Sequence, residues 1–246
     1  MTSRPAHGQD QALIALAQAA ADEVSDGMIV GLGTGSTAEA LVQELGRRVS
    51  GGLRIVGVPT SQRIADLARS LDIPIRTLND VLEEGETIAV GLDGADEIDP
   101  ALNATKGRGG ALLFEKLVAL SCERFVLIAG EAKLVTRLGS RMPLPVEVVA
   151  LGWPGTLARL DVLGLNPRLR MTVPVGSDPA TSYRTDSQNL IIDCATGALA
   201  DPVATATALK ATTGVVEHGL FLRIAHAAYV ADADGMVRML TPAEAS

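Results

Sequence analysis

The chain has 246 residues, of which 47% are apolar and 20% are charged, with 21 Lys and Arg against 29 Asp and Glu. This length and apolar content can build one large domain, or a domain with a smaller lobe, and they exclude a disordered chain. The formal charge of −8 argues against a nucleic-acid partner, which requires a basic surface, but not against a small anion held by backbone N–H groups. No apolar run approaches the ~18 residues of a membrane span, so no membrane partner is expected.

The cysteines and the first ten residues indicate the compartment. Cys122 and Cys194 are far apart and have no CxxC partner, as expected for reduced core residues. Residues 1–10 carry no apolar segment of the signal-peptide type. The sequence therefore predicts a cytoplasmic protein.

Apolar strands alternate with helices in the first half of the chain. A helix capped by Asp10 is expected to end at Gly27, and Met28–Leu32 follow as a buried strand. Ser36 stands three residues before Glu39, which is the spacing of a capping box at the start of the next helix. This alternation predicts an open, mostly parallel, Rossmann-like α/β sheet with helices on both faces. The elements expected next are Leu53–Val58, Ser61–Leu71, Thr87–Leu92, a helix after the turn Lys106–Gly110, and Phe125–Ala129.

The pattern changes after Lys133, where six prolines between residues 143 and 179 interrupt the chain. Mixed short strands and helices there predict a smaller α+β lobe at about 134–205. Residues 1–133 and about 206–246 would form the sheet domain that carries the active site. The expected elements are strands Val146–Ala150 and Leu190–Cys194, helices Trp153–Leu163 and Asp201–Ala211, and strands Gly214–Glu217, Phe221–Ile224 and Ala227–Ala231.

The first segment that can carry chemistry is Gly31–Thr37, with the sequence GLGTGST, between the first strand and the second helix. Glycines let the backbone approach a ligand, and the free N–H groups at a helix start suit an anion. Ser36 replaces the third glycine of a dinucleotide fingerprint, and no Gly-Lys-Ser/Thr of a P-loop follows. The segment fits either a ligand loop or a structural turn.

The second segment is Asp93–Glu97, with the sequence DGADE, just past a buried strand. It fits an active-site carboxylate pair at the carboxyl edge of the sheet, or turn chemistry in which Asp accepts from nearby backbone N–H groups. A metal site is disfavoured, because the histidines His7, His218 and His226 are remote in sequence.

The third segment is Lys106–Lys116, with the sequence KGRGGALLFEK. A turn separates Lys106 from Glu115, so both side chains can face one cavity, and burial of Glu115 would raise its pKa toward that of a general base. The alternative is a solvated helix face. A fourth candidate, Lys133, follows another strand and is either an anion ligand or a surface lysine.

Together these segments closely resemble the type A ribose-5-phosphate isomerases, and the likeness runs from about residue 11 to about residue 240. The resemblance implies an aldose–ketose isomerase of the non-oxidative pentose phosphate pathway, which interconverts D-ribose 5-phosphate and D-ribulose 5-phosphate without a metal or organic cofactor. It also implies a homodimer or a dimer of dimers. The matching stretches are Gly31–Thr37, Asp93–Glu97, Lys106–Lys116, Pro143–Val148 (PLPVEV), Thr185–Asp193 around NLIID, and Gly214–Phe221 (GVVEHGLF).

The resemblance assigns roles to particular residues. Glu115 falls on the family's base and Lys106 on its lysine, while Asp93 and Asp96 fall on its two aspartates. Asp93 is the candidate for moving the second proton, and Asp96 for orienting a lysine or a substrate hydroxyl. The implied substrate-binding residues are Gly33, Thr34, Gly35, Ser36, Thr37, Asp93, Gly94, Asp96, Lys106, Gly107, Gly109, Gly110 and Lys133, with no metal ligand.

Three departures from the family pattern concern phosphate recognition. Residues 12–15 carry no lysine, Arg108 stands where a glycine is common, and the segment Met171–Ser182 is longer than usual. Two other functions share the related fold, a sugar-phosphate sensor and a coenzyme A transferase. Neither would need the pairing of Lys106 with Glu115.

Overall fold

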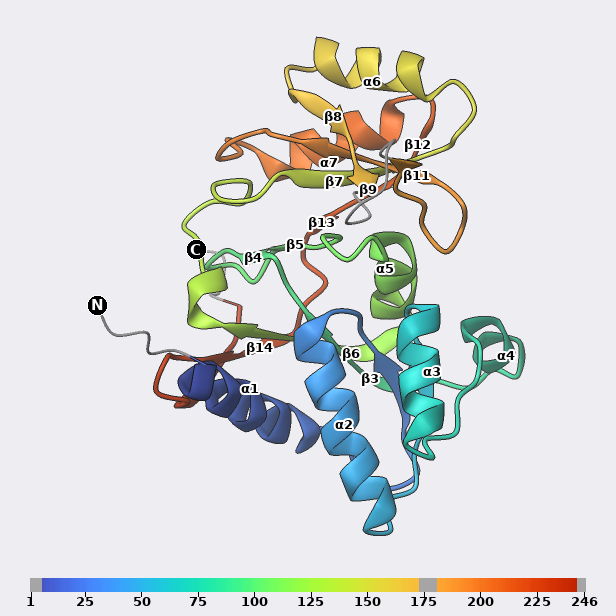
Figure 1. Ribbon diagram of the computed structural model, residues 1–246, viewed down its shortest axis with the longest axis vertical. Coiled ribbons are helices and arrows are strands. Elements are labelled where there is room, and N and C mark those ends of the chain that lie inside the picture. The colour runs from blue at the N-terminus through green and yellow to red at the C-terminus, as the bar shows by residue number, and fades with distance from the viewer. Residues whose placement is uncertain (1–5, 173–180, 243–246) are drawn as a thin grey trace.

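The computed structural model describes residues 6–172 and 181–242, and its larger part is built on a six-stranded sheet (Figure 1). The strand order is β15-β14-β6-β3-β1-β2, and every neighbouring pair is parallel except β14 with β15. The predicted open, mostly parallel sheet is therefore confirmed. The strands are β1 (Ile29–Leu32), β2 (Val56–Pro59), β3 (Ile88–Gly94), β6 (Cys122–Gly130), β14 (Ala227–Ala231) and β15 (Val237–Leu240).

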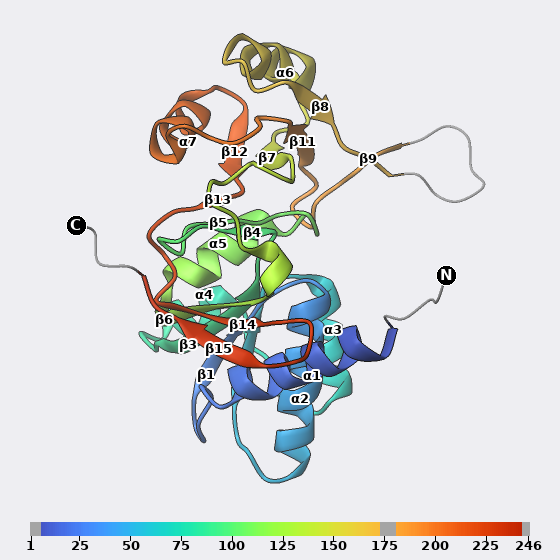
Figure 2. The ribbon, with the colours of Figure 1, turned by 90° about the vertical axis from the view of Figure 1, so that its left-hand side faces the viewer.

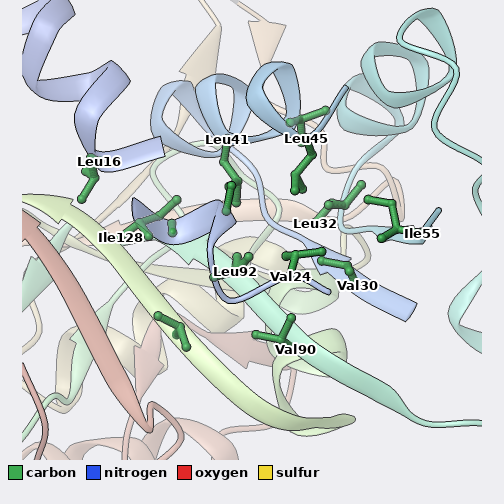
Figure 3. Packing of buried hydrophobic residues seen from close by; sticks show 14 of the residues in the cluster. Leu16, Val24, Val30, Leu32, Leu41, Leu45, Ile55, Val90, Leu92 and Ile128 are labelled. Carbon is green, nitrogen blue, oxygen red and sulfur yellow. The ribbon is translucent and has the colours of Figure 1, made fainter. Parts of the chain in front are cut away.

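One face of this sheet is covered by helices α1 (Ala6–Ala21), α2 (Ser36–Ser50) and α3 (Gln62–Ser70). Leu41 and Leu45 project from α2 into a cluster that also holds strand residues such as Leu92 (Figure 3). These side chains are fully buried, and such burial contributes about 1.5–3 kcal/mol per leucine relative to exposure. The cluster fixes the strand ends that carry the candidate site.

The opposite face is covered by helix α5 (Leu112–Leu120), by the short helix α4 (Leu78–Glu83) and by a three-stranded sheet. Phe221 is among the largest fully buried side chains and packs in the same cluster as Phe125 of β6. The three-stranded sheet has the order β13-β5-β4 and consists of β4 (Glu97–Ile98), β5 (Ala104–Thr105) and β13 (Leu220–Phe221).

A second lobe lies beyond α5 and β13 and has its own core (Figure 2). Its four-stranded antiparallel sheet has the order β12-β7-β11-β8, and helices α6 and α7 pack with it. The chain remains in this sheet up to His218, the last residue of β12 that pairs with β7. The sequence predicted that the chain returns to the larger domain earlier, near residue 206. The lobe contains β7 (Leu144–Val148), α6 (Trp153–Val162), β8 (Pro167–Leu169), β11 (Leu190–Cys194), α7 (Pro202–Ala211), β12 (Val215–His218) and the strand pair β9 (Met171–Thr172) and β10 (Thr181–Ser182).

Two predicted helix N-caps are wrong, although helix α2 begins at Ser36 as predicted. Helix α1 begins at Ala6, so Asp10 lies inside the helix and not at its start. The capping box of Ser36 and Glu39 does not form: Gly35 is the N-cap, with φ +116°, and no side chain caps it. The Glu39 carboxylate instead pairs with Arg63 of α3 at 2.7 Å, so it is turned away from the helix start.

None of the helices in the described ranges combines the length and apolar character that a membrane crossing requires. Most of the long segment Met171–Ser182 noted in the sequence, residues 173–180, lies outside the described residues. Helix α4 and strand β15 had no clear pattern in the sequence, and the structure adds them to the predicted elements.

Candidate active site

The parallel pairing of β1 with β3 brings the first two candidate segments together. Leu32, the last residue of β1, lies opposite Leu92, and β3 continues from there to Gly94, so the segments that follow both strands lie at the same edge of the sheet. The backbone N–H of Thr34 donates to Asp93 Oδ1 at 3.1 Å, and the N–H of Gly94 donates to the same oxygen at 2.7 Å. A Cβ on Gly33 would lie 2.2 Å from Asp93 Cγ. Glycine is therefore required at position 33 for Asp93 to occupy its place.

Lys106 links these strand ends to helix α5. Its Nζ lies 2.9 Å from Asp93 Oδ2 and 3.3 Å from Glu115 Oε1, and it donates to the carbonyl of Gly94 at 2.6 Å. The Phe221 ring lies beside it, with the centroid 5.5 Å from Nζ. Burial alone would lower the pKa of Lys106, but the carboxylates of Asp93 and Glu115 outweigh it and raise that pKa. Lys106 is therefore held between the two carboxylates, which favour its ammonium form.

Glu115 lies in the first turn of α5, and its side chain is only 4% exposed, which excludes the predicted alternative of a solvated helix face. Burial raises its pKa to about 8; Lys106 opposes this rise and the charge of Asp93 adds to it. Oε2 is buried and has no hydrogen-bond partner among the described residues. A carboxylate oxygen with a raised pKa and a free lone pair can act as a general base near neutral pH.

Asp93 is also buried, and burial raises its pKa although Lys106 and the two backbone N–H groups oppose the rise. Two carboxylates thus share one ammonium, and all three side chains are almost completely buried. In such a site the interaction of Lys106 with a negatively charged oxygen is much stronger than in water.

A cavity of about 310 Å³ opens onto this cluster at the carboxyl ends of β1 and β3. Ten of the predicted substrate-binding residues line it together with Glu115, while Gly33, Asp93 and Gly110 are not among its lining residues. Ala95 and Arg108, which the sequence did not assign to the site, also line it. The lining residues are Thr34, Gly35, Ser36, Thr37, Gly94, Ala95, Asp96, Lys106, Gly107, Arg108, Gly109, Glu115 and Lys133.

The start of α2 forms one wall of the cavity. The helix is 15 residues long, and no side chain of the described residues caps its first turn, so its N–H groups are available to an anion. The hydroxyl of Thr34 is held by Thr60 at 2.7 Å and by Ser61 at 2.8 Å, two contacts that the sequence did not predict. Lys133, in the 3₁₀ helix η1 (Glu131–Lys133), places a further cation on the lining.

The glycine-rich loop after Lys106 forms another wall. The carboxylate of Asp96 accepts from the backbone N–H of Arg108 at 3.0 Å, so Asp96 fixes this loop as well as facing the cavity. Among the described residues no group of three or more His, Cys, Asp or Glu side chains is arranged to hold a metal ion. The groups that face the cavity are therefore suited to bind an anion and to transfer a proton.

The family model of ribose 5-phosphate isomerase A (phosphoriboisomerase A) matches residues 56–235. The ribose-5-phosphate isomerase A of Synechococcus sp. is 49% identical over 229 residues, which cover 92% of this chain and 96% of the relative. The chain belongs to the ribose 5-phosphate isomerase A family. The isomerase A of Roseiflexus castenholzii is similar to the same extent, with 48% identity over 92% of this chain and 94% of the relative.

Solved structures of this family share the fold. A D-ribose-5-phosphate isomerase in complex with phospho-erythronic acid superimposes with a TM-score of 0.85 at 36% identity, over 95% of this chain and 98% of that chain. The ribose 5-phosphate isomerase from Plasmodium falciparum gives a TM-score of 0.84 at 35% identity, over 94% and 98%. The family predicted from the sequence motifs is thereby confirmed.

Proposed function

We propose that this protein interconverts D-ribose 5-phosphate and D-ribulose 5-phosphate by proton transfer through an enediolate. The observation that supports this most strongly is the position of Lys106 between Asp93 and Glu115, together with Glu115 Oε2, which has no hydrogen-bond partner in the described part of the chain. Family membership points to the same reaction.

In the forward direction ionised Glu115 takes the proton from C2 of the open-chain aldose. The C2–H electron pair forms the C1=C2 double bond, and the carbonyl pair moves onto O1, where Lys106 stabilises the negative charge. The O2 proton then passes to O1, the C2=O2 bond forms, and Glu115 returns its proton to C1. One carboxylate can serve both steps because C1 and C2 are adjacent.

The second proton, which moves between O2 and O1, needs a group of its own. Asp93 is buried and does not line the cavity, whereas Lys106, whose Nζ lies 2.9 Å from Asp93 Oδ2, does line it. We therefore assign Asp93 a role through Lys106, whose ammonium can pass and regain a proton while Asp93 holds it in place. Asp96, on the lining itself, is the candidate to orient a substrate hydroxyl.

The phosphate is assigned to the start of α2, where Ser36 and Thr37 line the cavity and the helix dipole favours an anion. Lys133 and Arg108 supply positive charge on the same lining, in a chain whose residues 12–15 contain no lysine. Phospho-erythronic acid, the ligand of the related structure, carries a phosphate at one end and a planar carboxylate at the other, which resembles the enediolate in shape and charge.

We also propose a cytoplasmic homodimer or dimer of dimers. Both cysteines are free, as expected in a reducing compartment. On the smaller lobe Leu151 is 92% exposed and Val162 is 89% exposed, and a partner subunit would cover such side chains. Sedimentation velocity of the purified chain tests the assembly, and a monomer at micromolar concentration would contradict it.

The function is tested by incubating chelator-treated protein with ribose 5-phosphate in deuterated water and following the reaction by proton NMR. We expect ribulose 5-phosphate to form with deuterium from the solvent at C1, because the base exchanges its proton with water during the reaction. A sugar-phosphate sensor or a transferase would give binding without conversion, and that result would contradict the proposal.

A further inference from the structure

Three successive carbonyl groups in the glycine-rich loop are held by side chains of the smaller lobe. Arg170 Nη1 donates to the carbonyl of Gly107 at 2.9 Å and to that of Arg108 at 3.0 Å. The Tyr183 hydroxyl donates to the carbonyl of Gly109 at 3.0 Å. Neither Arg170 nor Tyr183 lines the catalytic cavity, so both contacts reach the loop from its outer side.

Contacts within the smaller lobe hold the Arg170 side chain in place. Its Nε donates to Asp193 Oδ2 at 2.8 Å, and its Nη2 pairs with the other oxygen of the same carboxylate. Its backbone N–H donates to the carbonyl of Ile191, and the Tyr183 ring lies 5.7 Å from the guanidinium. The Arg170 side chain is only 15% exposed. A bidentate contact between a guanidinium and a carboxylate fixes the orientation of the arginine side chain as well as stabilising it.

The carbonyl contacts determine where the N–H groups of the loop point, since C=O and N–H of a trans peptide face opposite ways. The Gly107–Arg108 peptide illustrates this: its carbonyl meets Arg170, and its N–H donates to Asp96 on the other side. In the next peptide the carbonyl of Arg108 meets Arg170, so the N–H of Gly109 points away from the lobe. That N–H has no partner among the described residues, and Gly109 lines the cavity.

We propose that Arg170, held by Asp193, is a positioning residue that directs the Gly109 N–H into the cavity to donate to an oxygen of the sugar chain. The sugar chain is assigned because the loop begins at Lys106, beside the reacting end, while the phosphate is placed at α2. This inference rests on the proposed isomerase function, and it adds a residue from the second lobe to the substrate site.

Gly110 and Tyr183 fit the same arrangement. Gly110 has φ +80°, and a Cβ there would lie 2.2 Å from the Tyr183 hydroxyl. Glycine is therefore required at position 110 for a reason other than contact with the substrate. It allows the lobe to approach closely enough for Tyr183 to hold the carbonyl of Gly109.

The test compares Arg170→Gln with Arg168→Gln, a matched control in which an exposed arginine of β8 is changed. For Arg170→Gln we expect kcat/KM to fall about 10- to 100-fold, as for a misplaced binding group. The Kd of phospho-erythronic acid should rise by a similar factor, whereas the Kd of inorganic phosphate should change less than twofold. Arg168→Gln should leave all three values unchanged, and Arg170→Lys should not rescue Arg170→Gln.

A direct signature is the amide signal of Gly109 in NMR spectra of the unmodified protein. Phospho-erythronic acid should shift it downfield as the N–H gains an acceptor, and inorganic phosphate alone should not. An unmoved signal, or equal weakening of both ligands in Arg170→Gln, would overturn the proposal. The Kd values and the Gly109 amide shift are measured without turnover, so they test this proposal independently of the isomerase function.

Discussion

Lys106 Nζ lies 3.3 Å from Glu115 Oε1, and both side chains are almost completely buried. The contact engages one oxygen of the carboxylate and leaves Oε2 without a hydrogen-bond partner within residues 6–172 and 181–242. A base needs a free lone pair, and an enediolate needs a nearby cation. In the proposed mechanism this single contact provides both, because Lys106, the cation assigned to the transition state, also holds Glu115, the assigned base, in place.

The raised pKa of Glu115 predicts a pH-dependent activity. Only the ionised carboxylate can accept the C2 proton, so kcat/KM should rise with pH until the pKa of the free enzyme is passed. Since burial raises that pKa to about 8, the rise should extend well above the range of an exposed glutamate. A pH profile of kcat/KM measures it, and a plateau already reached by pH 5.5 would contradict the assignment.

Gly33→Ala should disable the site without touching substrate. The new Cβ would lie 2.2 Å from Asp93 Cγ, so Asp93 and with it Lys106 must move. We expect kcat to fall at least about 100-fold, the effect of displacing catalytic groups by about 1 Å. Gly155→Ala in helix α6 is the control, because the nearest atom to its Cβ is the end of the Arg159 side chain at 3.5 Å. Equal activity of the two variants would refute the argument.

The buried ion pair between Lys116 of α5 and Glu217 of β12, with Nζ and Oε1 2.7 Å apart, joins the two lobes. Lys116→Met should lower the free energy of unfolding by about 3 kcal/mol, since it removes the buried partner of Glu217 and leaves this partly buried carboxylate with only the exposed Lys210 as a cationic partner among the described lysines and arginines. Lys210 pairs with the same carboxylate at 3.1 Å but is 50% exposed, so Lys210→Met should cost less than about 1 kcal/mol. Urea unfolding of both variants measures the difference, and equal losses would contradict this account of the pair.

Removal of divalent ions should leave activity intact. Proton transfer between Glu115 and adjacent carbons, with Lys106 opposite the developing charge, needs no Lewis acid. The coupled assay is run after dialysis against a chelator. A loss of turnover that one divalent ion restores would refute a proton-transfer mechanism based on these side chains alone.

Much of the site follows from local sequence. The strand ends are marked by apolar runs that stop at Gly33 and Asp93, and parallel strands bring such ends to one edge. The burial of Glu115 did not follow from its own segment, because α5 is packed against a sheet whose strands are scattered over the chain. The resemblance to a family, carried by six stretches, decided between the open alternatives.

Other features depend on packing that no single segment encodes. Thr60 and Ser61 hold Thr34 across a sheet edge, and Arg170 and Tyr183 reach the glycine-rich loop from 60 or more residues away. The capping box predicted at Ser36 is absent because of another long-range contact. A long-range ion pair to Arg63 took the Glu39 carboxylate that the local pattern assigned to the helix start.

The most direct test of the account is the Glu115→Gln variant, assayed for isomerisation and for exchange of the transferred hydrogen with labelled water. Glutamine keeps the size of the side chain but cannot accept a proton from carbon. We expect kcat to fall about 10²- to 10⁴-fold with little change in KM, and exchange to vanish with turnover. The exposed Glu123, changed to Gln, is the control and should retain full activity. If Glu115→Gln isomerises and exchanges at a near-normal rate, another group is the base, and the central claim is wrong.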